Sequence, residues 1–370
     1  MNKKFKKNIG VLHLWLGLSS GLIVFIVALT GSLLVFEKEI DEFVNPEFYK
    51  VQHTGNAKKP LDYCTNILLE NYSIEKINRI STFNDPQRTI TIVGKDTLGV
   101  TKIFSIDPYT GKVLGVVEQK SRFFSVVLNI HRQLLLDDTG EIITGCSCLI
   151  FVFMLISGMI LWWPKKAKNV KQRLTVKWNA SLKRVNWDFH STFGFYSFLF
   201  LLIISLTGLT WSFKWFENGM YFLADGAIKK ASPKVENPTK IDPKLDQATF
   251  FQSIYKKSDS IFPYTGNIQI RMPSDTINGV LVLKEHLDKS IPNQSSAVYF
   301  DKYTTEIIEI RPYDSFSNGD KLRRLVYPIH TGSIYGYPTK IAAFLVCLFA
   351  LTLPITGLLI WLGKKSKKKM

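Results

Sequence analysis

The sequence predicts a membrane protein: an α-helical bundle of four spans, built as a tandem repeat, with two small α+β modules outside the membrane. Three observations predict this fold class: four long apolar stretches, a positive charge confined to three short segments, and histidines that recur at fixed intervals. Aromatic residues make up 13% of the 370 residues. This composition favours a membrane protein over two or three soluble domains.

Four stretches are apolar and long enough to cross a hydrocarbon core of roughly 30 Å. They are Ile9–Phe36, Ile142–Trp163, Gly194–Phe213 and Ile341–Leu362. The first resembles a signal peptide in its basic start, but its apolar run is too long and no small-residue cleavage motif follows it. We therefore expect the first stretch to remain as an anchor.

Nearly all of the net charge of +17 is concentrated in residues 1–8, 164–189 and 363–370. These segments hold 17 of the 47 lysines and arginines but a single acidic residue, Asp188. The positive-inside rule places both termini and the middle loop in the cytoplasm, as expected for a multi-pass protein of a bacterial inner membrane. Because the charge reports topology, the lipid bilayer is an expected partner and nucleic acid is not.

This topology predicts eight segments. They are 1–36, the N-terminal tail and first span; 37–130, the first periplasmic module with an interfacial helix; 131–163, an interfacial segment and the second span; 164–189, the basic cytoplasmic loop; 190–213, the third span; 214–329, the second periplasmic module; 330–362, the fourth span with its lead-in; and 363–370, the basic tail.

Both exported segments share one plan, in which a helix candidate precedes short β-rich runs. The helix candidates are "LDYCTNILLENY" and "LDQATFFQSIYKK", and strands are expected in "RTITIVGKDTLGVTKIFSIDPYTGKVLGVVEQ", "INGVLVLKEH" and "SAVYFDKYTTEIIEIRPY". A turn motif, Asp-x-Tyr-Thr, recurs at Asp107 and Asp301. A small α+β module is therefore predicted twice.

The spans carry a second sign of duplication. Each contains Ser or Thr followed by Gly near its end, in "TGSLLVF", "SGMILWW", "TGLTWSF" and "TGLLIWL". An interval of 17 residues separates His13 from Thr30, and one of 26 residues separates His131 from Ser157. The second half repeats both intervals with His190, Thr207, His330 and Thr356. The chain is therefore predicted to be a tandem repeat of span, module and span.

Four of the six histidines occupy these repeated positions. One interfacial histidine would be ordinary, because amphipathic side chains reach toward water, but ionisable groups in spans are costly and usually functional. The predicted topology places His13 and His190 near the cytoplasmic face and His131 and His330 near the outer face. Two further histidines, expected to be ordinary surface residues, are His53 and His286.

Two imidazoles that face each other across a helical bundle can take both axial positions of a haem iron. Zinc fits less well, because a structural zinc site wants four ligands, and no Cys-x-x-Cys-His motif for covalent haem occurs. We expect two haem b groups, an inner one on His13 and His190 and an outer one on His131 and His330. Iron with both axial positions taken favours electron transfer over oxygen chemistry.

Arginines near these histidines are candidate partners of haem propionates, although lipid phosphates would suit them equally well. They are Arg132, Arg184, Arg323 and Arg324. No Gly-x-Gly-x-x-Gly fingerprint occurs, and the loop 164–189 is too short for a flavin or nicotinamide domain. The electron donor is therefore expected to be a membrane quinol or another redox protein.

The four spans, in order, resemble the PepSY-associated transmembrane proteins, iron-regulated inner-membrane proteins that include haem-containing ferrisiderophore reductases. The segments that carry the resemblance are "LHLWLGLSSGLIVFIVALTGSLLVFEKEID", "NIHRQLLLDDTGEIITGCSCLIFVFMLISGMILWWPKK", "DFHSTFGFYSFLFLLIISLTGLTWSF" and "PIHTGSIYGYPTKIAAFLVCLFALTLPITGLLIWL". The exported "SIDPYTGKVLG" is similar to the closing strand and turn of a PepSY module. The resemblance covers nearly the whole chain.

This resemblance implies an oxidoreductase that passes electrons through b-type haems to a periplasmic ferric siderophore or other Fe(III) chelate and releases Fe(II). The histidines of the family correspond to His13, His131, His190 and His330. The family's usual His-Arg pair is replaced here by His13-Leu14 and His190-Ser191, which leaves the cation partner of the inner propionates unassigned. The alternative hypothesis is a non-redox PepSY membrane protein that regulates a peptidase, a cell-wall process or a transporter.

Overall fold

The computed structural model describes residues 2–52, 55–164, 166–228, 249–274, 279–287 and 292–365. The chain divides into two units. The first unit comprises residues 1–36, 126–223 and 325–370, and the second comprises residues 37–125 and 224–324. All four repeated histidines belong to the first unit.

Within the described ranges, the first unit contains four helices that are long and apolar enough to cross a membrane. They are α1 (Lys3–Val35), α6 (Asp137–Trp162), α8 (Leu182–Ser212) and α12 (Tyr337–Lys365). Helices form over all four predicted spans, and each helix begins before its apolar stretch. Helices suit this role because they satisfy every backbone hydrogen bond internally, as the hydrocarbon core of a membrane requires.

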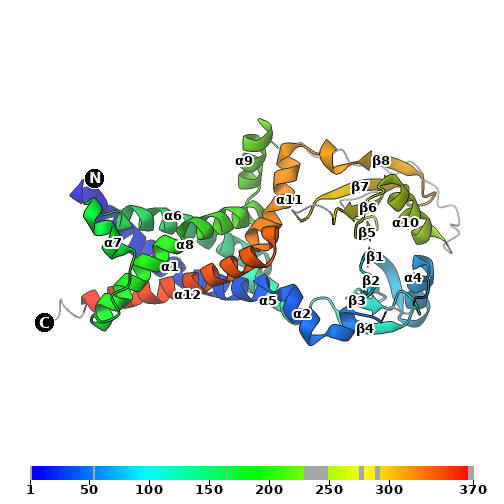
Figure 1. Ribbon diagram of the computed structural model, residues 1–370, viewed down its shortest axis with the longest axis horizontal. Helices are drawn as coiled ribbons and strands as arrows, with labels where there is room; N and C mark the ends of the chain where they lie inside the picture. Colours follow the sequence, from blue (N-terminus) through cyan, green and yellow to red (C-terminus); the bar gives the residue numbers. More distant parts are fainter. Residues whose placement is uncertain are drawn as a thin grey trace. The chain divides into compact units, whose positions relative to one another are not determined.

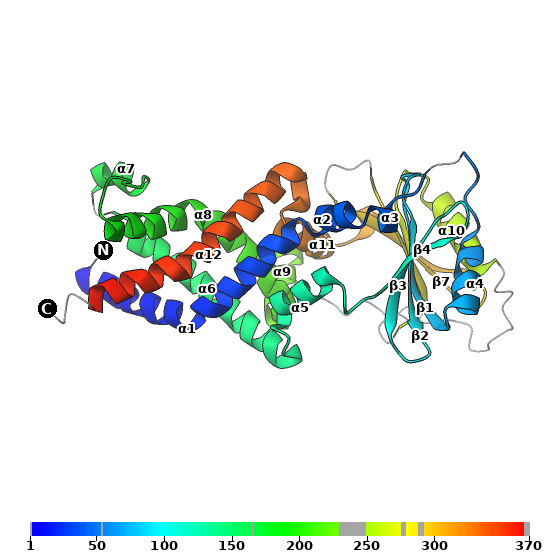
Figure 2. The same ribbon diagram turned by 90° about the horizontal axis from the view of Figure 1, so that it is seen from below.

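The four long helices lie side by side in a bundle (Figures 1 and 2). Helices α1 and α8 each contact both α6 and α12, so α1 and α8 face each other across one diagonal of the bundle. The start of α1 and the end of α12 lie at the same end (Figure 1). Small side chains are buried between the helices, as is usual where backbones pack closely in a membrane; they include Ser20, Gly21, Ser147, Ser197, Ser205 and Ala350.

Two shorter helices lead into the second and fourth spans. Helix α5 (Phe123–Gln133) precedes α6, and α11 (Asn318–His330) precedes α12. The corner after α5 is tight: Leu134 and Leu135 have positive φ, and a Cβ on Gly140 would lie 1.6 Å from the carbonyl oxygen of Gln133. Only glycine fits at Gly140. The break between the two helices therefore lies ahead of "DDTG", which forms the first turn of α6.

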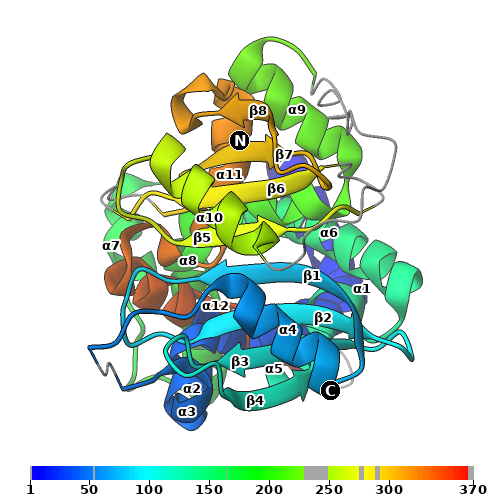
Figure 3. The same ribbon diagram turned by 90° about the vertical axis from the view of Figure 1, so that its right-hand side faces the viewer.

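The second unit, over its described residues, is built on one antiparallel sheet of eight strands in the order β4-β3-β2-β1-β5-β6-β7-β8 (Figure 3). The strands are β1 (Ile74–Thr82), β2 (Ile90–Asp96), β3 (Thr101–Ile106), β4 (Val113–Glu118), β5 (Ile268–Arg271), β6 (Val280–Glu285), β7 (Ser295–Phe300) and β8 (Ile307–Arg311). The two predicted modules thus share a sheet, because β1 pairs with β5. This pairing satisfies two strand edges that would otherwise be exposed.

One face of the sheet is covered by α4 (Leu61–Asn71) and α10 (Phe250–Ile261) (Figure 3). Alternate strand residues point into the core beneath these helices, among them Ile80, Ile92, Phe104, Ile270 and Val298. The repeated Asp-x-Tyr-Thr motif forms the same turn in both halves of the sheet. Asp107 accepts a hydrogen bond from the amide of Tyr109 at 2.8 Å, and Asp301 accepts one from Tyr303 at 2.7 Å.

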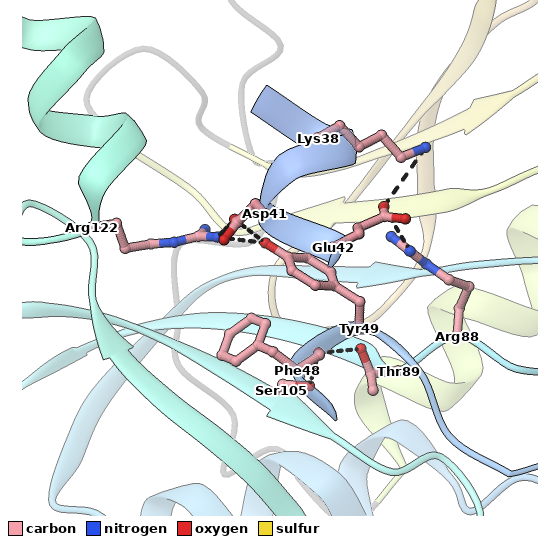
Figure 4. A network of polar contacts seen from close by, with 9 residues as sticks. All are labelled: Lys38, Asp41, Glu42, Phe48, Tyr49, Arg88, Thr89, Ser105 and Arg122. Atoms are coloured by element: carbon pink, nitrogen blue, oxygen red, sulfur yellow. Dashed lines mark hydrogen bonds and ion pairs between the residues drawn. The ribbon is translucent and has the colours of Figure 1, made fainter. Parts of the chain in front are cut away.

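The segment that follows α1 is fastened to the sheet by polar contacts (Figure 4). It comprises α2 (Glu37–Val44) and α3 (Pro46–Tyr49). Asp41 accepts from the Tyr49 hydroxyl and pairs with Arg122, and Glu42 pairs with Arg88 at 2.8 Å. Burial raises the pKa of Tyr49 to about 12, so this hydroxyl keeps its proton for Asp41. The segment therefore has a fixed path along the second unit.

Further short elements are η1 (Ala167–Asn169), α7 (Val170–Arg173), α9 (Lys214–Asp225), η2 (Tyr313–Ser315) and η3 (Ser333–Tyr335).

The two helices on the sheet cap each other, and this contact yields a prediction. Asp62 of α4, only 1% exposed, accepts hydrogen bonds from the amides of Phe251 and Gln252 at 2.8 and 2.9 Å. We expect Asp62→Ala to destabilise the second unit by about 1–2 kcal/mol, because two buried donors lose their acceptor. Chemical denaturation of the full chain measures this loss.

The matched control is Glu70→Ala, which removes an exposed carboxylate from the same helix. Hydrogen exchange should accelerate at the first turn of α10 in the Asp62 variant and not in the control. Equal stability of the two variants would contradict the capping role.

Candidate functional site

The first histidine pair consists of His13 on α1 and His190 on α8. Their ring centres lie 6.4 Å apart, with the ring planes at 90°. The two residues come from helices that face each other across the bundle, so neither helix alone could form the pair. The sequence predicts that these two histidines lie at the same level of the bundle, and in the structure their side chains meet.

The second histidine pair consists of His131 on α5 and His330 on α11. Their ring centres lie 6.2 Å apart, with the planes at 70°. The indole of Trp211 packs edge-on against His330, with ring centres 5.2 Å apart. Burial and, to a smaller extent, the neighbouring His330 lower the pKa of His131 to about 4. Burial also lowers the pKa of His330, so both rings are neutral at pH 7.

Each imidazole is held by the hydroxyl of a Ser/Thr-Gly motif. In the first pair, Nδ1 of His13 lies 2.8 Å from Oγ of Ser157, and Nδ1 of His190 lies 2.9 Å from Oγ1 of Thr356. The second pair uses the motifs of the other two spans. His131 contacts Thr30 and His330 contacts Thr207, both at 3.1 Å.

The hydrogen bonds of these hydroxyls fix which imidazole nitrogen carries the proton. Each hydroxyl donates its own proton to a carbonyl three or four residues earlier in its helix, at 2.7–3.1 Å. It can therefore only accept from the imidazole, so Nδ1 is the protonated nitrogen. In the second pair, Nδ1 also lies within 3.0 Å of a backbone carbonyl, that of Val27 or Ile204.

The remaining nitrogen, Nε2, keeps its lone pair in all four rings. Within the described residues, no hydrogen bond involves Nε2 of any of the four. A histidine whose Nδ1–H is held by an oxygen and whose Nε2 is open has the usual arrangement of a metal ligand. The geometry therefore prepares two pairs of neutral nitrogen donors.

The glycine of each motif makes room for the imidazole. A Cβ on Gly31 would lie 3.1 Å from Cε1 of His131, and one on Gly208 would lie 3.3 Å from Cε1 of His330. The corresponding distance is 3.4 Å for Gly158 with His13 and for Gly357 with His190. The motif thus has two roles: its hydroxyl holds the ring, and its glycine lets the ring approach the helix.

A cavity of about 510 Å³ adjoins the first histidine pair. Its wall is mainly apolar, and several glycines allow helix backbones to line it: Gly10, Gly17, Gly21, Gly158, Gly194 and Gly357. Two cations also line it. Lys6 lies two turns ahead of His13 on α1, and Arg173 belongs to α7. Their side chains donate to the carbonyls of Trp163 and Trp162 at the end of α6.

None of the arginines singled out from the sequence lines this cavity. Arg132 is exposed, and its backbone carbonyl accepts from the hydroxyl of Thr144 at 2.6 Å. Arg184 pairs with Asp188 at 2.9 Å and is not among the residues that line the cavity. Arg323 and Arg324 belong to the second unit. The cations beside the first pair, Lys6 and Arg173, were missed, although Lys6 shares a helical face with His13 at a spacing of seven residues.

The two other histidines are His53 and His286, and the structure describes only His286. His286 is half-buried rather than on the surface as expected, because its ring stacks on Tyr264 with centres 3.6 Å apart. His53 lies outside the described residues. In the part of the chain that the structure describes, no three His, Cys, Asp or Glu residues come together in a manner that could hold a metal ion.

A family model described as "PepSY-associated TM region" matches residues 11–364. The chain belongs to the PepSY-associated transmembrane family. No curated protein matches the chain. The family match covers all four spans, and it includes both histidine pairs and the four Ser/Thr-Gly motifs that hold them. The two histidine pairs and the motifs that hold them therefore belong to the matched region of this PepSY-associated protein.

The protonation of the rings can be tested without a cofactor. We expect cofactor-free protein, labelled with ¹⁵N-histidine, to show all four imidazoles protonated at Nδ1 in NMR spectra. Replacing Thr207 by Val removes the hydroxyl but keeps the shape, and it should shift the signals of His330 while those of His13 stay unchanged. Signals from rings protonated at Nε2 would contradict the assignment.

Proposed function

We propose that the chain is an inner-membrane electron-transfer protein that holds two b-type haems through four histidines and reduces a ferric siderophore or other Fe(III) chelate outside the cytoplasm. One observation carries this proposal. The four imidazoles form two pairs, every ring keeps an open Nε2, and the distance between the two rings of each pair suits a shared iron. Haem, when bound, supplies a one-electron Fe(III)/Fe(II) couple.

The separation can be compared with simple geometry. A metal–imidazole nitrogen bond is about 2.0–2.1 Å long, and a ring nitrogen lies about 1.2 Å from the ring centre because ring bonds measure about 1.3–1.4 Å. Two imidazoles on one iron then have centres about 6.4 Å apart. The observed separations are 6.4 and 6.2 Å. Two histidines that merely pack in a protein core would have no reason to keep their ring centres at this separation.

The open Nε2 atoms and the size of the cavity also support a bound metal cofactor. Two Nε2 lone pairs in an apolar cavity would be costly without a partner, and a metal bound by both would satisfy them. The cavity volume of about 510 Å³ falls within the roughly 300–1,000 Å³ that is usual for ligand and cofactor sites. Lys6 and Arg173 would pair with the carboxylates of the group. They would thus take the role of the arginine that usually follows the histidine in the family, where this chain has Leu14 and Ser191.

The two histidine pairs lie at different depths. His13 and the residue that holds His131, Thr30, are 17 residues apart on α1. At a rise of about 1.5 Å per residue, the two levels are about 25 Å apart along the helix. The same interval separates His190 from Thr207 on α8. Two redox centres at these levels would connect the two faces of a membrane.

The basic segments orient this path. The positive-inside rule puts the starts of α1 and α8 and the end of α12 in the cytoplasm, so the first pair would hold the haem nearer the electron donor and the second pair the haem nearer the acceptor. The donor would be quinol or a redox protein. The second unit would then lie in the periplasm.

We further propose that the chain arose as a tandem repeat with two PepSY modules. His13 with Ser157 corresponds to His190 with Thr356, and His131 with Thr30 corresponds to His330 with Thr207. Helix α4 with β1 to β4 likewise corresponds to α10 with β5 to β8. One ancestral unit of two spans and a module accounts for all of these correspondences.

Haem content is the direct test. Protein purified from haem-replete cells should carry two haems per chain in a pyridine haemochrome assay and show low-spin b-type bands after reduction. His13→Ala or His190→Ala should remove one haem, and His131→Ala or His330→Ala the other, because each haem would lose one of the two histidines that hold it. His286→Ala is the control and should retain both. A colourless wild-type preparation would refute the proposal.

The reductase activity has its own assay. In proteoliposomes loaded with quinol, Fe(III)-citrate should oxidise the reduced protein, and ferrozine should trap Fe(II). The second-pair variants should lose this activity. Full haem loading without Fe(II) formation would restrict the proposal to electron transfer to another acceptor.

Lys6 and Arg173 give a prediction specific to this chain. The double change Lys6→Gln/Arg173→Gln should lower occupancy of the first site by roughly tenfold or more in a haem titration, because charge-assisted hydrogen bonds are lost. The second site should stay loaded. Arg184→Gln is the matched control, since Arg184 is already paired with Asp188. Equal loss in the control would rule out the two cations as carboxylate partners.

A further inference from the structure

Two arginines face each other at the centre of the eight-stranded sheet. Arg79 of β1 lies directly opposite Arg271 of β5 in the register that joins the two halves. Their neighbours Ile80 and Ile270 are fully buried in the core beneath α4 and α10. Since successive strand residues point to opposite faces, both arginines belong to the face that these helices do not cover.

Like charges directly opposite on adjacent strands are destabilising, so this arrangement needs a reason. Nε of Arg79 is buried, and within the described part of the chain it has no hydrogen-bond partner. Arg271 donates from Nε to the side-chain oxygen of Gln269 at 2.5 Å. Among the described residues, no carboxylate forms an ion pair with Arg79 or Arg271.

A third arginine adds to this charge. Arg324, just before the end of the second unit, donates to the carbonyl of Ser295 at 3.1 Å, and its guanidinium stacks on Phe316 at 4.0 Å. Burial lowers the pKa of Arg79. Burial also lowers the pKa of Arg271, and the positive charges of Arg79 and Arg324 lower it further. The positive charges of Arg79 and Arg324 therefore both act on Arg271.

A fourth arginine nearby provides an internal comparison. Arg311 of β8 makes a two-point ion pair with Glu309, at 2.5 and 2.8 Å, and lies over the ring of Tyr299. This arginine carries its own carboxylate. The same sheet face thus contains one arginine that pairs with a carboxylate of the protein, and a central arginine pair for which the described residues supply no carboxylate.

We propose that Arg79, Arg271 and Arg324 form a binding site for a carboxylate-rich anionic metal chelate. Guanidinium groups bind carboxylates through two parallel hydrogen bonds, and several of them close together select for multiple negative charges. The identification of the chelated metal as Fe(III) rests on the proposed function. The site then favours anionic carboxylate chelates over neutral or cationic hydroxamate chelates as the electron acceptor.

Equilibrium binding tests the site in the full-length protein. The probe is Ga(III)-citrate, a redox-inert analogue of an Fe(III) chelate, titrated calorimetrically into detergent-solubilised protein. The comparison probes are metal-free citrate, inorganic phosphate and a cationic Ga(III) trihydroxamate. We expect Ga(III)-citrate to bind at least tenfold more tightly than any comparison probe, because it presents several carboxylates in one rigid anion.

The variant Arg79→Gln/Arg271→Gln should bind Ga(III)-citrate at least tenfold more weakly. The matched control is Lys76→Gln/Lys95→Gln, which removes two exposed charges that also lie opposite each other, on β1 and β2. The control should bind like the wild type. Equal weakening in both variants would mean general electrostatic attraction and would overturn the site, as would equal binding of phosphate or of the cationic chelate.

The outcome is separable from that of the proposed function. Binding of Ga(III)-citrate requires no redox step, so a His131→Ala/His330→Ala protein should bind it as the wild type does. Chelate binding by a protein that takes up no haem would support the arginine site and refute the electron-transfer proposal. Two haems per chain without chelate binding would support the electron-transfer proposal and refute the arginine site.

Discussion

The site depends on one hydrogen bond, made four times, between an imidazole Nδ1–H and a hydroxyl whose own proton is already donated to its helix. A serine or threonine in a helix commonly donates to a carbonyl one turn earlier, and this leaves its oxygen as an acceptor. The bond therefore sets the tautomer as well as the position of the ring. Replacement of the hydroxyl by a donor group would reverse the tautomer and turn Nε2 into a protonated nitrogen.

This bond also connects the helices of the bundle. His13 on α1 is held by α6, and His190 on α8 is held by α12. The second pair is held by α1 and α8 in turn. Each contact fixes one helix against its neighbour, and the glycine beside each hydroxyl allows the close approach that such packing needs. Binding geometry and helix packing therefore share the same residues.

The second unit depends on a different constraint: the backbone groups at the edge of a strand need hydrogen-bond partners. In two separate four-stranded sheets, β1 and β5 would be open edge strands. Their pairing in one sheet satisfies the backbone groups of both. The same pairing places Arg79 opposite Arg271. A like-charged pair at the join is tolerable if an anion neutralises it, so the join between the two halves is also where a charged ligand is proposed to bind.

The sequence by itself determined the four spans, because a long apolar stretch leaves few alternatives to a helix in a membrane. It also determined the repeat intervals that single out four histidines and four Ser/Thr-Gly motifs. It could not assign the contacts between them: the 17-residue interval separates His13 from Thr30, whereas the hydroxyl that holds His13 belongs to Ser157. Lys6, Arg173 and the pair of Arg79 with Arg271 were likewise invisible. Residues that meet through helix packing or strand register are distant in the chain, and only the tertiary structure decides which of them touch.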